Sequence, residues 1–229
     1  MFGVTQVYVV GMDTKDSNYL KKVQKKYDGW KYDSSLYCLF DEYNILKDWL
    51  ESTDGRLLLD AGCGWGKYFS LEREAGFQTV GVDISAKLLR DLKKRIKDAD
   101  VVLADISFLP FKPKVFDITT CMFGPLNHTH NLKRTINELY GVTNKRIVAS
   151  VYNYIGYMGY LWTFQKFAKL RTKWFDRHFM PFKRLFVPTS LISAFPHGKV
   201  MTLEGIIKPS TKNRVIMWFS KLLFIVIDI

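Results

Sequence analysis

The sequence predicts an α/β fold with a doubly wound, mostly parallel sheet, and two features of the chain favour it. Short apolar segments alternate with amphipathic ones between residues 57 and 152, a pattern typical of parallel strands joined by right-handed helical crossovers. The first of these apolar segments runs directly into a glycine-rich turn, where such sheets bring their backbone close to a ligand. With 229 residues and 48% apolar content, the chain can bury one core of this kind.

The expected elements follow one another in order along the chain. Apolar residues three and four positions apart predict a helix over 40–50. Ser85 is a typical N-cap residue, and a stripe of core-facing leucines follows it. The expected strands are 57–60, 79–83, 101–104, 116–122 and 146–152, followed by 200–208 and 222–229. The expected helices between them are about 66–75, 85–97 and 131–140.

The turn after the first strand is the most specific motif. Asp60 ends the strand, and three glycines follow at alternate positions, Gly62, Gly64 and Gly66. A dinucleotide fingerprint would need Gly or Ala at the position of Lys67. A P-loop would need Ser or Thr after that lysine, where this chain has Tyr68. The spacing therefore excludes both of these nucleotide sites.

The remaining pattern, D-x-G-x-G-x-G, resembles the S-adenosylmethionine (SAM) site of Rossmann-like, class I methyltransferases, in particular those of type 11. The resemblance extends from about Tyr27 onward, and three later segments support it. The strand 79–83 ends in Asp83, Asp105 precedes a Leu-Pro-Phe segment, and 116–123 resembles the fourth strand of the superfamily. Four strand-end motifs in the right order are much more specific than one glycine-rich turn.

The resemblance implies a cofactor site at the carboxyl ends of these strands. The glycines would let the main chain approach the methionine moiety, and Asp60 would orient its ammonium group through charge-assisted hydrogen bonds. Asp83 would accept hydrogen bonds from the ribose hydroxyls, and Asp105 would meet the adenine amino group. The other residues expected in the cofactor site are Ile84, Ile106, Cys121 and Tyr27, the last in a Tyr-Asp-rich segment that resembles the superfamily's lid.

The resemblance also implies the domain organisation. The last two strands would form an antiparallel pair that completes a seven-stranded sheet within a single domain. We expect an N-terminal lid and helices at 1–50, the SAM-binding core at 51–153, an aromatic and basic helical cap at 154–199, and the C-terminal strands at 200–229. The apolar stretch that ends the chain is then core strand, and it is too short for a membrane span.

The net charge of +12 is concentrated in the C-terminal part of the chain, where residues 150–229 carry twelve Lys/Arg and three Asp/Glu. Within 154–184 these charges are interleaved with aromatic residues. This composition is typical of a surface that binds tRNA, of one that lies on an anionic membrane, or of a lid with solvated lysines over a small-molecule site. The sequence leaves all three interpretations open, and it does not specify an oligomeric state.

The implied activity is methyl transfer from SAM, with S-adenosylhomocysteine (SAH) as product. His128 follows the fourth strand and is a candidate general base; the alternative is a loop histidine that caps the helix beginning near Asn131. A weaker local resemblance links the Gly-Cys-Gly-x-Gly-Lys-Tyr turn to wobble-uridine tRNA methyltransferases. That family has a His-His pair where this chain has Asn127 and His128, so the acceptor is either a small molecule or tRNA. Rival hypotheses are a lipid methyltransferase at a membrane surface and a non-catalytic SAM-binding subunit.

The three cysteines (Cys38, Cys63 and Cys121) are widely separated and show no C-x-x-C spacing. This argues against a disulfide framework and a zinc site, and it fits a reducing, cytoplasmic location. Cys63 is interpreted as a small residue tolerated in the glycine turn. We expect no signal peptide, no transmembrane segment and no metal requirement.

Overall fold

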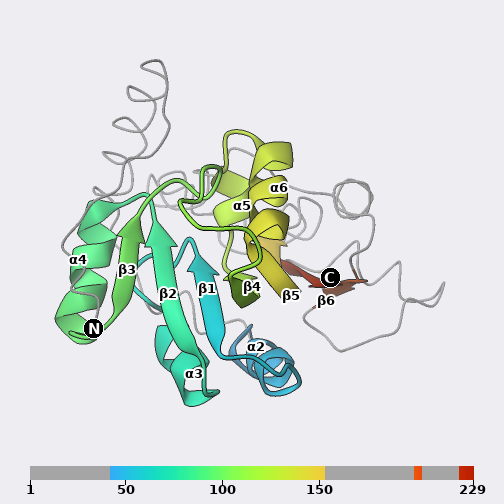
Figure 1. The fold of residues 1–229 in the computed structure, drawn as a ribbon, viewed down its shortest axis with the longest axis horizontal. Helices are drawn as coiled ribbons and strands as arrows, with labels where there is room; N and C mark the ends of the chain where they lie inside the picture. Colours follow the sequence, from blue (N-terminus) through green and yellow to red (C-terminus); the bar gives the residue numbers. More distant parts are fainter. Residues whose placement is uncertain (1–41, 153–198, 203–221) are drawn as a thin grey trace, which may run out of the picture.

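The computed structural model describes residues 42–152, 199–202 and 222–229 (Figure 1). The helices are α2 (Glu42–Glu51), α3 (Phe69–Glu74), α4 (Ala86–Arg95), α5 (Pro125–His128) and α6 (Leu132–Val142). The strands are β1 (Leu57–Ala61), β2 (Gln78–Asp83), β3 (Asp100–Leu103), β4 (Phe116–Cys121), β5 (Thr143–Tyr152), β6 (Lys199–Thr202) and β7 (Leu222–Asp228). The predicted lid with Tyr27, the basic cap within 153–198 and the strand residues 203–208 lie outside the described residues.

All seven strands form one sheet in the order β3-β2-β1-β4-β5-β7-β6. Strands β1 to β5 pair in parallel, and β7 runs antiparallel to both β5 and β6. Figure 1 shows β3, β2 and β1 side by side, with their carboxyl ends at the same edge. The strand order reverses at β1, which places a switch point between β1 and β4. The predicted doubly wound α/β fold is therefore confirmed.

Side chains alternate between two cores, one on each face of the sheet. On one face, Ile147 and Ala149 of β5 pack in a cluster that includes Leu139 of α6. On the other face, Val148 packs in a cluster that includes Leu46 of α2, and Leu71 of α3 belongs to the same cluster. Residues 147–151 of β5 are thus buried on both faces, as is typical of a central strand in a doubly wound sheet.

Most predicted boundaries agree with the structure to within a few residues, and the differences have local causes. α3 begins at Phe69 rather than near 66, because Gly66 adopts a left-handed φ of 80°, which lies outside the helical region. β5 begins at Thr143, directly after α6, so the predicted connection between them does not exist. The short helix α5 was not predicted, since four residues are too few for a periodic pattern.

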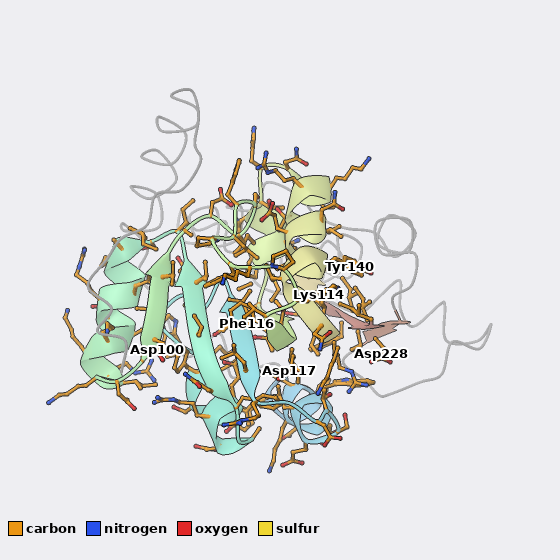
Figure 2. The ribbon with its side chains drawn as sticks, in the orientation of Figure 1. Asp100, Lys114, Phe116, Asp117, Tyr140 and Asp228 are labelled. Carbon is orange, nitrogen blue, oxygen red and sulfur yellow. The ribbon has the colours of Figure 1, made fainter. Side chains whose placement is uncertain are left out.

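Side chains fasten the amino edge of the sheet, opposite the expected ligand edge. The carboxylate of Asp117 on β4 accepts hydrogen bonds from the backbone N–H groups of Arg56 (2.8 Å) and Leu57 (3.2 Å), at the start of β1 (Figure 2). The ammonium group of Lys114 donates to the carbonyl oxygens of Tyr140 (3.0 Å) and Thr143 (2.7 Å), where α6 passes into β5. These bonds fix the relative positions of the strands whose opposite ends carry the motifs.

Gly66→Ala should destabilise the fold more than Gly76→Ala. Both glycines have positive φ, 80° and 92°, so both variants bear the left-handed cost of about 1–2 kcal/mol. A Cβ on Gly66 would lie 2.3 Å from Cδ1 of Leu92, whereas one on Gly76 meets no atom of the described part of the chain within 4 Å. Overpacking adds about 1–3 kcal/mol to the first variant. Urea unfolding measures the difference, and equal losses in the two variants would contradict the packing at Gly66.

Candidate functional site

The predicted motif residues after β1 and β2 meet at the carboxyl edge of the sheet. The backbone N–H groups of Gly62 and Cys63 donate to the carbonyl oxygen of Val82 at 2.7 and 3.0 Å, which ties the glycine turn to β2. The carboxylate of Asp83 then bridges two elements. Its Oδ2 accepts from the Gly64 N–H (2.9 Å), and its Oδ1 accepts from the Ser85 N–H (2.8 Å). Asp83 thereby holds both the turn and the start of α4.

Gly64 differs from its neighbours because the space beside it is open. Its φ is 55°, and among the described residues a Cβ built there would touch only Cδ1 of Leu88, at 3.9 Å. Glycine is therefore required here by the backbone conformation and not by protein packing. The turn leaves room at its middle for a ligand to approach the main chain.

Asp105 follows β3, the outermost strand of the sheet, at the same carboxyl edge, and a local hydrogen bond holds its carboxylate in place. Its Oδ1 accepts from the backbone N–H of Ser107 (2.8 Å). The Ser107 hydroxyl lies 2.7 Å from that of Thr135 on α6 and 3.1 Å from that of Thr129. This buried hydroxyl cluster joins the Asp105 loop to α6.

The three apolar residues expected in the site have different surroundings. Ile84 is half-buried and directly follows Asp83. Ile106 and Cys121 are buried in the α6-side core together with Leu126. Their side chains therefore support the edge from within, and any contact of Ile106 or Cys121 with a ligand would come mainly from the backbone.

Asp60 is 3% exposed, at the end of β1. Burial and the nearby charge of Asp83 raise the pKa of its carboxyl from 3.8 to about 8. Its Oδ2 has no hydrogen-bond partner among the described residues. An acceptor that is both buried and unsatisfied is unusual, and it fits a residue that completes its bonding with a ligand.

Glu72 is a buried acid that the sequence analysis missed. It lies on α3 and is fully buried, and its Oε1 accepts from the hydroxyl of Thr120 on β4 (2.8 Å). Burial and the charge of Asp60 raise the pKa of Glu72 well above its ordinary value. The sequence does contain a sign of it: Glu72 follows Phe69 by three positions, so both side chains lie on the same face of a helix. A charged residue on a buried helix face is rare.

A candidate general base, His128, and a cysteine interpreted as a small turn residue, Cys63, were also expected near this edge. His128 is half-buried at the last position of α5, just beyond the carboxyl end of β4. The helix-capping alternative is wrong for His128, because the side chain of Asn131 caps α6 by accepting from the N–H of Arg134 (3.1 Å). Burial and the charges of Asp60 and Asp83 raise the pKa of the Cys63 thiol well above its ordinary value, so Cys63 is a poor nucleophile.

Within residues 42–152, 199–202 and 222–229, no group of three or more His, Cys, Asp or Glu side chains is placed to hold a metal ion. In the same part of the chain, no helix is long and apolar enough to cross a membrane.

Comparison with known proteins finds a matching family model over part of the chain. Residues 58–146 match the family model of a methyltransferase domain. An uncharacterized protein of Methanocaldococcus jannaschii is 38% identical over 121 residues, which are 53% of this chain and 44% of the relative. A tRNA (carboxymethyluridine(34)-5-O)-methyltransferase of Arabidopsis thaliana is 31% identical over 125 residues, 52% of this chain and 30% of that enzyme. The chain thus spans less than half the length of either protein, and the tRNA enzyme is only a distant relative.

A solved structure shows the same fold over most of the chain. It is a chain from the complex between the Haloferax volcanii Trm112 methyltransferase activator and a methyltransferase. That chain is 16% identical, with a TM-score of 0.61 over 87% of this chain and 96% of that one. The matched domain, the sheet order and the glycine turn agree with one another. The part of the chain from residue 58 to 146 is thus similar to a methyltransferase domain, and its sheet has the order expected of Rossmann-like, class I SAM-dependent methyltransferases.

Proposed function

We propose that this chain is an enzyme that transfers a methyl group from SAM to an acceptor and releases SAH. The observation that carries the proposal is the carboxylate of Asp83, which joins the open glycine turn to α4 at the switch-point edge of the sheet. Ligands of doubly wound sheets bind at this edge. The buried, unsatisfied Oδ2 of Asp60 beside it fits a cationic group of the ligand.

Each cofactor residue would contribute a separate contact. Asp83 would accept hydrogen bonds from the ribose hydroxyls, because each of its oxygens has a second lone pair besides the one that binds backbone N–H. The backbone at Gly64 would lie against the methionine moiety, and Asp60 would bind its ammonium group. Asp105 would accept from the adenine amino group.

Bound SAM supplies an electrophilic methyl group on a sulfonium, so the chain's own task is to align the acceptor and remove a proton. His128 would serve as the general base, since it lies just past the carboxyl end of β4 and an imidazole titrates near neutral pH. None of the proposed contacts requires a metal ion.

The acceptor is proposed to be a small molecule or tRNA, and a non-catalytic SAM-binding subunit is the rival hypothesis. Incubation of the protein with methyl-labelled SAM and separate tRNA, lipid and metabolite fractions tests all of these. Label in one fraction identifies the acceptor class. Binding of SAM without label in any fraction would favour the non-catalytic subunit, and failure to bind SAM would refute the proposed function.

Asp83→Ala should weaken SAM binding by more than tenfold, about 1.4 kcal/mol, because contacts to a charged acceptor are lost. Isothermal titration calorimetry measures the affinity, and the melting temperature shows whether the variant folds. Asp100→Ala is a matched control, since it removes the same charge at the amino end of the neighbouring strand β3, away from the ligand edge (Figure 2). Unchanged affinity in a folded Asp83→Ala protein would remove Asp83 from the site.

SAM affinity should rise with pH between about pH 5.5 and 7.5, by up to about tenfold per unit. The reason is that the Asp60 carboxyl, with a pKa of about 8 in the free protein, must lose its proton before it can pair with an ammonium group. Calorimetry in buffers of different ionisation enthalpy should show release of a proton on binding. A flat pH dependence would contradict pairing with Asp60.

Asp60→Asn should bind SAM more weakly and yet resist unfolding better at neutral pH. A raised folded pKa gives stability that is complete below the ordinary value of 3.8 and is lost as pH rises toward about 8. Asparagine does not ionise, so its advantage over the wild type should grow by roughly 1 kcal/mol per pH unit between about pH 5 and 8. Urea unfolding at both ends of this range measures the difference, and a constant difference would contradict the raised pKa.

A further inference from the structure

The buried carboxyl of Glu72 has no part in the cofactor contacts described above. It lies on α3 with none of its surface exposed, among core side chains of which Phe69 and Leu71 belong to the same helix. An acid in this position lowers stability unless it is neutral or bonded. Its burial beside the apolar residues of α3 therefore calls for a functional explanation.

The register of the sheet places Glu72 beside Asp60. Asp60 of β1 pairs with Thr120 of β4, and side chains of paired residues project from the same face of a sheet. The Thr120 hydroxyl donates to Oε1 of Glu72 at 2.8 Å. Glu72 is therefore bonded to the strand neighbour of Asp60, on the same face of the sheet as the Asp60 side chain. The effect of the Asp60 charge on the Glu72 pKa agrees with this placement.

Each of the two acids has one buried oxygen without a hydrogen-bond partner among the described residues, Oδ2 in Asp60 and Oε2 in Glu72. Two ionised carboxylates could not satisfy each other, since both only accept. A single proton on Oε2 of Glu72 resolves this, because a protonated carboxyl can donate to Oδ2 of Asp60.

We propose, on the basis of the proposed SAM site, that Glu72 is a positioning residue. Its neutral carboxyl donates a hydrogen bond to Asp60 and holds the Asp60 carboxylate toward the ammonium group of the cofactor. Glu72 itself does not touch the cofactor. The bond links α3 to the ligand edge through the side chains of Thr120 and Asp60.

The surroundings favour a proton on Glu72. Asp60 faces it from β1 and Thr120 from β4, while Cys63 of the glycine turn and Asp83 of β2 complete the group of interacting acids. The buried α2 residues of the core on this face are apolar, Leu46 and Leu50. Burial and the Asp60 charge both raise the pKa of Glu72, and the Thr120 bond lowers it. Asp60 is assigned as the acid that ionises when a cation binds, because it lies near the carboxyl end of β1 at the ligand edge, whereas Glu72 lies on α3.

The test compares Glu72→Gln with Glu72→Leu. The Gln amide keeps a neutral donor and an acceptor, so its SAM affinity should stay within about threefold of the wild type. The Leu side chain has neither, and its affinity should fall by about tenfold or more at a melting temperature no lower than that of the wild type. Glu74→Leu, at an exposed position of the same helix, is the matched control and should bind like the wild type.

Each pattern of results has a distinct meaning. Wild-type affinity in Glu72→Leu would reduce Glu72 to a packing residue and overturn the proposal. Equal losses in the Gln and Leu variants would show that a charge is required, which also overturns it. If the wild type itself does not bind SAM, the proposed function fails together with this inference, whereas a failure confined to the variants refutes the inference alone.

A direct measurement keeps the proposal testable if Glu72→Leu does not fold. The carboxyl carbons of isotopically labelled glutamate report ionisation by NMR, and Glu72→Gln identifies the signal of Glu72 by its absence. In the wild type this signal should remain at the protonated position from about pH 5 to 7.5. A titration within that range would overturn the proposal. The pH dependence of SAM affinity should persist in Glu72→Gln, because Asp60 still has to ionise.

Discussion

The two hydrogen bonds accepted by the carboxylate of Asp83 are the constraint on which the rest of the site depends. One binds the N–H of Gly64 and the other binds the N–H of Ser85, so a single side chain sets the distance between the turn after β1 and the start of α4. An ionised acceptor is suited to this role, because charge-assisted bonds are shorter and stronger than neutral ones. Together with burial, the charge of the same carboxylate raises the pKa of Asp60. Asp83 therefore affects both the backbone geometry of the edge and the ionisation of Asp60.

Burial of acids at this edge favours ligand binding but lowers the stability of the fold. Asp60 and Glu72 lie in a core that would be more stable with apolar residues, as is general for buried ionisable groups. Such a core persists where a ligand or a shared proton compensates the cost, which is the arrangement expected at a functional site. The acid at the opposite edge does not lower stability in this way. Asp117 accepts hydrogen bonds from two backbone N–H groups, and the pKa of its carboxyl is lowered chiefly by the Arg56 bond.

The sequence predicted the strands and the glycine turn well because their physical signals are local. A parallel strand buried on both faces is rich in consecutive apolar residues, as Leu57–Leu59 of β1 are, and Ser85 capped α4 as its residue type indicated. Glu72 was missed because its importance depends on Thr120, forty-eight residues away, and no local pattern shows that contact. The start of α3 was placed too early because the backbone angle of Gly66 cannot be obtained from helical periodicity.

The position of β7 has a consequence for how this sheet is assembled. β7 lies between β5 and β6 and pairs with both, although residues 222–228 follow β5 by about seventy positions in the chain. Strands β1 to β5 can pair in the order of their synthesis, but β5 has an open edge until β7 arrives. Contacts of such long sequence separation form slowly, and an unpaired apolar edge is prone to intermolecular association. Chaperone dependence and aggregation during synthesis should therefore be governed by the docking of this one strand.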